Sequence, residues 1–234
     1  MSILPDPTRP QPIASRKHSL ILTAILLAFA LAGYAALLRG TAGGAAPKSG
    51  SVILYLALLA AEWGLFVYVR MGLKRHGTSL PRLISDRPLT VRTLAVDALL
   101  GLLLLGLFAG AELLLSKLLG NGNTALVQTL LVRQASLVPL WMLLAASAGF
   151  VEELTFRGYF QRQFGAWLGS PWLGVAAQAV LFGVTHGYQG GVLIVKITLF
   201  GILFGLAALL RRSLVPGMVA HAGLDMIGGL AAFR

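Results

Sequence analysis

The sequence contains no cysteine among its 234 residues, and only 12% of its residues are charged. The absence of cysteine excludes disulfide bonds, a thiolate nucleophile and metal sites with cysteine ligands. A soluble domain carries about a quarter charged residues, whereas this chain is 57% hydrophobic and has a mean hydropathy of +0.81. The composition therefore excludes an ordinary soluble domain and predicts an integral membrane protein.

Acidic residues are scarce as well, because eight Asp and Glu stand against nineteen Lys and Arg, for a net charge of +11. In a soluble protein this excess would suggest nucleic-acid binding. Here the basic residues lie between apolar runs, where anionic lipid headgroups and membrane orientation account for them. We expect anionic lipids at a basic inner loop, and no nucleic acid, as partners.

Seven apolar runs approach or reach the roughly 20 residues that a helix needs to cross a bilayer. They cover residues 20–38, 51–69, 95–116, 136–156, 172–190, 192–210 and 214–233. The fifth run is rich in glycine and alanine, so a broken or re-entrant helix is an alternative there. We predict an all-α, polytopic membrane bundle of about seven transmembrane helices without a soluble domain.

The distribution of Lys and Arg predicts the orientation of this bundle. With a cytoplasmic N-terminus, the inner segments hold twelve Lys and Arg and the outer segments hold five, as the positive-inside rule requires. We divide the chain into a cytoplasmic tail at 1–19, N-terminal membrane helices at 20–120 with a basic loop at 70–92, and a membrane core at 136–233. We expect this protein in a bacterial inner (plasma) membrane.

Most of the acidic residues fall inside the predicted spans, which is the reverse of their usual placement. The six acids in question are Glu62, Asp97, Glu112, Glu152, Glu153 and Asp225. Ionisable groups inside a bilayer are costly and normally face a polar cavity or a partner. We interpret Glu62, which is next to Trp63, as a buried hydrogen-bonding residue. Asp97 and Glu112 lie near the ends of the third run, where a side chain can reach the interface or, for Glu112, pair with Lys117. Glu152, Glu153 and Asp225, together with His186 and His221, indicate an intramembrane polar site.

The fourth run ends with Glu152, Glu153 and Arg157. Because residues four apart share one face of a helix, Glu153 and Arg157 are expected to pair. Glu152 points elsewhere, toward a stripe of small residues, and is the better candidate for a carboxylate that is free to do chemistry. The alternative is a salt-bridge cluster at a helix end with no catalytic role.

Two further runs carry histidines. Phe182 and His186 lie four residues apart in the fifth run, although a lone histidine in a helix more often packs or hydrogen-bonds than catalyses. His221 and Asp225 share one face in the seventh run, and a carboxylate beside an imidazole can fix its tautomer and stabilise its charge. Two ionisable groups on one intramembrane face must face something polar.

Read together, the motifs Glu152-Glu153-x-x-x-Arg157, Phe182-x-x-x-His186 and His221-x-x-x-Asp225 resemble those of the membrane glutamic proteases of the CAAX-prenyl-protease and bacteriocin-processing (Abi) family. The resemblance covers roughly residues 136–233, and residues 1–120 carry no assigned motif. It implies an intramembrane endopeptidase that uses no metal or other cofactor and acts on a membrane-associated peptide or protein, with or without a lipid.

The resemblance also implies a role for each matching residue. Glu152 would be the general base that activates a water, and His186 would help to hold that water. His221 and Asp225 would stabilise the oxyanion formed at the scissile carbonyl. The supporting residues would be Glu153, Arg157 and Phe182.

Asp225 departs from the common pattern, because many members of the family have Asn at this position. An amide donates a hydrogen bond to an oxyanion, whereas an ionised carboxylate does not. Either Asp225 is protonated, or it orients His221 and leaves that imidazole as the donor.

Three other hypotheses stay open from the residues alone. Glu152, His186 and His221 are acceptable zinc ligands, so a zinc-dependent membrane protease is one. A non-catalytic membrane immunity or scaffold protein of the same family is another. The third is a proton-coupled transporter, which would use the remaining intramembrane acids as a relay.

The predicted span limits leave one geometrical problem. Straight helices over the fourth and fifth runs would hold Glu152 and His186 beyond hydrogen-bonding reach. Bringing them together requires the fifth helix to start later or to break near its glycines, or the fourth to continue past Arg157. We expect the site in the cytoplasmic half of the membrane, with a lateral opening.

Overall fold

The computed structural model describes residues 10–43, 51–122, 128 and 130–230. Its α-helices are α1 (Arg16–Gly43), α2 (Val52–Arg75), α3 (Leu80–Ile84), α4 (Val91–Leu119), α6 (Val138–Glu153), α7 (Gln161–Leu168), α8 (Pro171–Thr185), α9 (Gly191–Arg211) and α10 (Val215–Leu230). A π-helical segment, η2 (Leu154–Phe160), joins α6 to α7, and the 3-10 turns are η1 (Ala135–Leu137) and η3 (Gly187–Gln189). The prediction of an all-α bundle is confirmed.

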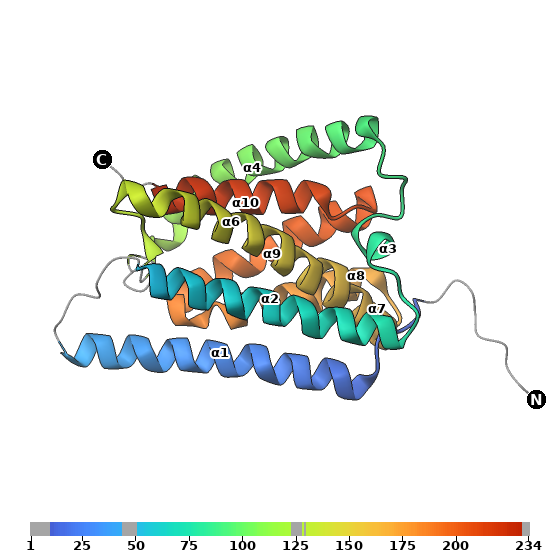
Figure 1. Cartoon of the computed structure of the whole chain (residues 1–234), viewed down its shortest axis with the longest axis horizontal. Helices are drawn as coiled ribbons and strands as arrows, with labels where there is room; N and C mark the ends of the chain where they lie inside the picture. Colours follow the sequence, from blue (N-terminus) through green and yellow to red (C-terminus); the bar gives the residue numbers. More distant parts are fainter. Residues whose placement is uncertain (1–9, 44–50, 123–127, 129, 231–234) are drawn as a thin grey trace, which may run out of the picture.

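Five helical stretches are long and apolar enough to cross a membrane. They are Arg16–Ala35, Val52–Arg75, Val91–Leu119, Ala135–Leu168 and Gly191–Arg211. The helices α8 and α10 are shorter, with 15 and 16 residues, and occupy the fifth and seventh predicted runs. In Figure 1 the long helices lie side by side, with α1 at one edge of the bundle, α4 at the other, and the C-terminal helices between them.

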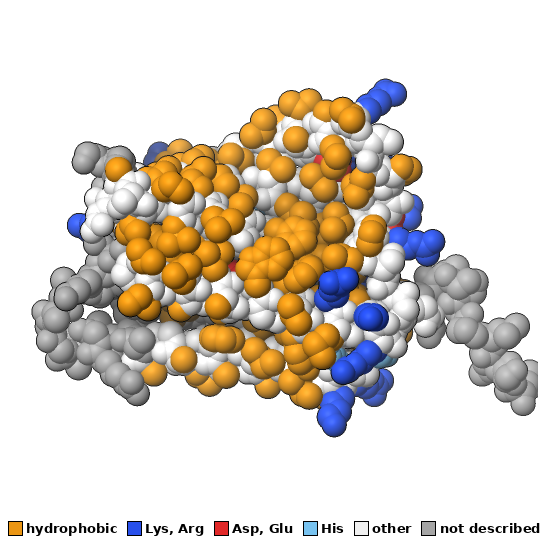
Figure 2. All heavy atoms as spheres, viewed as in Figure 1, with side chains coloured by type: hydrophobic (Ala, Val, Ile, Leu, Met, Phe, Trp, Pro, Cys, Tyr) orange, Lys and Arg blue, Asp and Glu red, His pale blue; other side chains and the backbone are white. Residues whose placement is uncertain are grey.

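The distribution of side chains on the surface is typical of a membrane protein, and one end of the bundle is basic. Figure 2 shows hydrophobic side chains across the middle of the visible face, whereas most of the Lys and Arg gather at the end where α1 begins and α2 ends. At this end the helix α1 begins at Arg16, four residues before the predicted span. Residues 1–9 of the predicted cytoplasmic tail and residues 231–233 of the last predicted span lie outside the described residues.

The basic loop at 70–92 is more ordered than its composition suggested. The helix α2 continues to Arg75, and the short helix α3 buries Leu83 completely against the bundle. Ser85 forms an isolated antiparallel bridge with Ser213. Two backbone hydrogen bonds, from Asp86 to Arg212 and from Leu214 to Ile84, attach the loop to the turn between α9 and α10.

The fourth helix continues well past its predicted end at residue 156. The helical path α6–η2–α7 runs to Leu168, because polar residues after Arg157 form hydrogen bonds inside the bundle instead of ending the span. Gln161 donates to the carbonyl of Gly205, and Gln163 exchanges hydrogen bonds with Ala14. Hydropathy alone predicts that the helix ends before polar residues such as Gln161 and Gln163.

The fifth helix, in turn, ends earlier than predicted. The helix α8 stops at Thr185, and Gly190 adopts a φ of 93°, which favours glycine, where the chain turns into α9. The broken helix was one of the two predicted forms of this run. At 1.5 Å per residue, Glu152 lies about 24 Å before the end of α7 and His186 about 22 Å beyond the start of α8. Both residues are therefore at the same depth.

Close packing of α6 on α10 completes the framework of the site. A Cβ atom added to Gly149 would lie 2.7 Å from the backbone nitrogen of Ala222 and 2.8 Å from its Cβ, so these helices approach as closely as glycine allows. One turn further along α6, Gly217 leaves room for the carboxylate of Glu153, which a Cβ there would approach to 2.7 Å. The small residues thus bring two glutamates against the helix that carries His221.

Candidate active site

The structure brings all of the predicted site residues into one cluster. Glu152 and Glu153 end α6, Arg157 lies in η2, Phe182 is in the last turn of α8, His186 caps that helix, and His221 and Asp225 lie on α10. These residues come from three separate parts of the sequence. The contacts between them define what each one can do.

Glu152 lies between two imidazole rings. Its Oε2 atom is 3.9 Å from Nε2 of His186 and 3.8 Å from Nε2 of His221. Both distances are too long for a direct hydrogen bond, and both suit a single bridging water. The same Oε2 atom is buried and has no hydrogen-bond partner within the described part of the chain. Glu152 thus offers a free acceptor at the point where the two rings converge.

The ring of His186 is held in one orientation by its own helix. Its Nδ1 lies 2.8 Å from the carbonyl oxygen of Phe182. Because a carbonyl only accepts hydrogen bonds, Nδ1 carries the proton, and in the neutral ring Nε2 is left as an acceptor facing Glu152. The ring of Phe182 packs edge-on against the imidazole, with centroids 4.7 Å apart.

The carboxylate that holds His221 is Glu153. Its Oε1 atom is 3.0 Å from Nδ1 of His221, whereas Oδ2 of Asp225 is 3.7 Å from Nε2. The i,i+4 spacing within α10 indicated Asp225 as the orienting group, but the shorter contact comes from a different helix. Nε2 of His221 therefore faces Oε2 of Glu152, at 3.8 Å, and Oδ2 of Asp225, at 3.7 Å.

Glu153 and Arg157 pair as their spacing predicted. Nη1 of Arg157 is 2.9 Å from Oε1 of Glu153, and both side chains are at most 1% exposed. The guanidinium also lies over the ring of Phe182, 4.2 Å from its centroid. The π-helical segment begins directly after Glu153, and such segments are frequent at functional sites. One buried cation thus contacts both the glutamate that holds His221 and the phenylalanine that packs on His186.

Two residues that the sequence analysis did not assign to the site also reach it. The carboxyl group of Glu62, on α2, interacts with Glu152, His221 and Asp225. Glu62 has no motif partner on its own helix, so only its intramembrane charge could have indicated a role.

The second of these residues is Tyr188, which lies in η3. Its ring centroid is 6.0 Å from that of His186, and Gln189 donates a hydrogen bond to its hydroxyl. No feature of the sequence around this tyrosine separates it from an ordinary loop residue.

The remaining intramembrane acids are bound to cations elsewhere. Asp97 accepts hydrogen bonds from Arg211 at 2.6 Å and from Ser213 at 2.7 Å. Glu112 accepts a hydrogen bond at 2.8 Å from Lys196, whose side chain is fully buried. These two ion pairs join α4 to the ends of α9, and neither acid contacts Glu152 in any described interaction.

A metal site does not emerge from the same geometry. Across the described ranges, no group of three or more His, Asp or Glu side chains is arranged to hold a metal ion. The Nδ1 atoms of both site histidines are engaged by protein oxygens, and their Nε2 atoms lie about as far from Glu152 as a bridging water requires.

Comparison with known families decides what kind of site this is. Residues 134–227 match the model of the family described as Type II CAAX prenyl endopeptidase Rce1-like. Over this part of the chain, which is less than half of it, the protein is similar to the Rce1-like family. The matched range includes the seven predicted site residues but excludes α1, α2 and α4. No curated protein and no solved structure shows a significant match to the chain.

The match to the Rce1-like family indicates a membrane peptidase. The match begins one residue before η1 and ends in α10, so it coincides with the helices that build the cluster. The helices α1 and α2 lie outside the matched range. Of these two helices, α2 adds Glu62 to the site. The resemblance inferred from the three motifs is therefore confirmed at the level of the family.

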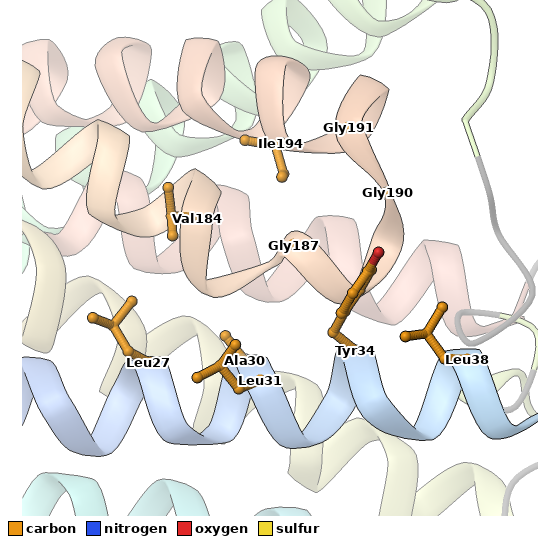
Figure 3. A pocket seen from close by; sticks show the side chains of 10 residues that line it. All are labelled: Leu27, Ala30, Leu31, Tyr34, Leu38, Val184, Gly187, Gly190, Gly191 and Ile194. Atoms are coloured by element: carbon orange, nitrogen blue, oxygen red, sulfur yellow. The ribbon is translucent and has the colours of Figure 1, made fainter.

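An apolar groove lies next to the Rce1-like core, between α1 and the η3 break (Figure 3). Its volume is about 810 Å³, within the range of pockets that hold small ligands. One wall consists of aliphatic and aromatic residues of α1, among them Ala30, Leu31 and Tyr34, and the other includes Val184, Gly187 and Ile194. Gly187 directly follows His186, so the groove adjoins the site.

Proposed function

We propose that this protein is an intramembrane endopeptidase that hydrolyses a peptide bond of a membrane-associated peptide or protein by means of a water activated by Glu152. The observation that carries the proposal is the free Oε2 atom of Glu152, which lies at bridging-water distance from two imidazoles. A carboxylate placed in this way can act as a general base without a covalent intermediate. The Rce1-like match supports peptide hydrolysis as the reaction class.

The first step that this geometry supports is attack by water. Glu152 takes a proton from a water that is also hydrogen-bonded to Nε2 of His186, and the water oxygen adds to the scissile carbonyl carbon. The carbonyl oxygen becomes an oxyanion. In its protonated form His221 donates to this oxyanion through Nε2–H, and the surrounding carboxyl groups stabilise the charge on its ring.

The second step breaks the peptide bond. Glu152 passes the proton that it took from water to the amide nitrogen, the carbon–nitrogen bond breaks, and the oxyanion returns to a carbonyl. Glu153 keeps Nδ1 of His221 protonated throughout, because its Oε1 atom is both hydrogen-bonded to that nitrogen and paired with Arg157. Asp225, at 3.7 Å from Nε2, adjusts the position of the ring.

The membrane setting supports a substrate with an apolar anchor. The groove beside η3 is lined by exposed hydrophobic side chains of α1, including Leu31 and Tyr34, and would hold a lipid chain or an apolar peptide segment. We also propose that the basic end of the bundle faces the cytoplasm, in a bacterial inner membrane, where its Lys and Arg would contact anionic lipids.

A cleavage assay tests the proposed function. The purified protein in nanodiscs should cut internal bonds in a library of quenched fluorescent peptides, some of them lipidated, and mass spectrometry should identify both new ends. A strong chelator should leave the rate unchanged. Loss of turnover in the chelator, with recovery on adding zinc, would replace this mechanism by a zinc-dependent one. Absence of turnover on every peptide would favour a non-catalytic immunity or scaffold protein.

Filling the groove should impair only substrates that use it. Ala30→Phe places a large side chain in the groove, so KM for lipidated peptides should rise about tenfold, which corresponds to a loss of about 1.4 kcal/mol of binding. The rate for short unlipidated peptides should stay the same. The matched control is Ala28→Phe, on the exposed side of α1. An equal KM for wild type and Ala30→Phe would show that the groove does not bind the substrate.

A further inference from the structure

The helix α2 packs on α6 with the face that carries Glu62. Trp63 donates a hydrogen bond at 3.2 Å to the hydroxyl of Ser147. Phe66, one turn after Glu62 and on the same face, packs against Phe150, with ring centroids 5.7 Å apart. These contacts bring α2 against the stretch of α6 that leads to Glu152, and Glu62 interacts with Glu152 from this helix.

The carboxyl groups of Glu62 and Glu152 lie close enough to hydrogen-bond each other. The Oε2 atoms of both residues are buried, and neither has a hydrogen-bond partner in the described part of the protein. Two ionised carboxylates are acceptors only and cannot bond to each other. The contact becomes a hydrogen bond as soon as one of the two groups carries a proton.

The ionisable neighbours of Glu62 are mostly acids. The ionisable groups that interact with it are Glu152, His221 and Asp225, so two of its three neighbours are acids and neither Lys nor Arg is among them. In a buried site, two adjacent carboxyl groups do not both ionise, and one proton is shared between them. Oε2 of Glu152 lies within 3.9 Å of both imidazoles, whereas His186 is not among the described groups that interact with Glu62.

We propose that Glu62 is a positioning residue of the proposed peptidase, a protonated carboxylic acid that donates a hydrogen bond to Glu152. This bond would fix the Glu152 carboxylate so that its free oxygen points to the water between the two imidazoles. The inference rests on the proposed role of Glu152 as the base. It extends the site to α2, which lies outside the range matched by the Rce1-like family.

Substitutions at Glu62 separate hydrogen bonding from proton transfer and from packing. Glutamine keeps a donor in the same place, so Glu62→Gln should retain kcat within about threefold of wild type. Alanine removes the donor, and Glu62→Ala should lower kcat about tenfold with KM nearly unchanged, as the loss of one positioning hydrogen bond implies. An equal loss of kcat in Glu62→Gln and Glu62→Ala, or a wild-type kcat in Glu62→Ala, would overturn the proposal.

Infrared spectroscopy tests the shared proton without relying on turnover. Wild-type protein in nanodiscs should show the carbonyl stretch of a protonated carboxylic acid, and Glu62→Gln should abolish it. The matched control is Asp86→Asn, since Asp86 is partly exposed and pairs with Arg162 and Arg212 outside the site, and it should leave the band in place. If the band is absent from wild type, or persists in Glu62→Gln, the proposal fails even if peptides are cleaved. If the band behaves as expected but no peptide is cleaved, the proposed function fails instead.

Discussion

Arg157→Met should destabilise the protein by about 3–5 kcal/mol, because it leaves the buried carboxylate of Glu153 without its cation. The Arg157 and Glu153 side chains are at most 1% exposed, and no other Lys or Arg pairs with Glu153 in the described part of the chain. Methionine fills a similar volume, so loss of charge and not a cavity should dominate. The midpoint of thermal unfolding, measured in nanodiscs, should fall markedly.

A double substitution distinguishes this electrostatic cause from loss of packing. Glu153→Gln in the Arg157→Met background removes the unpaired carboxylate and should restore much of the stability. It should not restore peptide cleavage, since glutamine holds Nδ1 of His221 less firmly than a carboxylate does. If Arg157→Met unfolds at the same temperature as wild type, the pair does not stabilise the site.

Glu152→Gln should lower kcat by about 10²–10⁴-fold, the usual contribution of a general base. The change replaces one oxygen by nitrogen and conserves shape, so the fold and the affinity for peptides should be retained. Asp86→Asn makes the same chemical change in a partly exposed acid that pairs with Arg162 and Arg212, away from the cluster, and should leave kcat within about twofold. A similar loss in both variants would indicate a general defect of folding, not loss of a base.

The sequence predicts the overall architecture well because membrane spans depend mainly on length and hydropathy. The seven predicted runs correspond to seven helical stretches, and the three motifs lie where the structure forms one cluster. The end of the fourth helix was predicted wrongly. Gln161 and Gln163 look like the end of a span, and only tertiary contacts with Gly205 and Ala14 show how they are accommodated.

The contacts inside the cluster depend on geometry that sequence spacing does not contain. The i,i+4 rule correctly predicted the pair of Glu153 and Arg157, which lies on a single helix. It also suggested that Asp225 holds His221, whereas Glu153 reaches Nδ1 from the neighbouring helix. Glu62 was interpreted as a buried hydrogen-bonding residue outside the site for the same reason, because its partners lie about 90 or more residues away in the sequence.

The most direct test of the central claim is a single-turnover comparison of wild type and Glu152→Gln. Each protein, in nanodiscs and in excess over a quenched peptide that wild type cleaves, is mixed with that peptide in the presence of a strong chelator. This design measures the chemical step without product release. We predict cleavage by wild type and a rate at least about a hundredfold lower for Glu152→Gln, with equal peptide binding. Cleavage by Glu152→Gln at the wild-type rate would contradict a water activated by this glutamate.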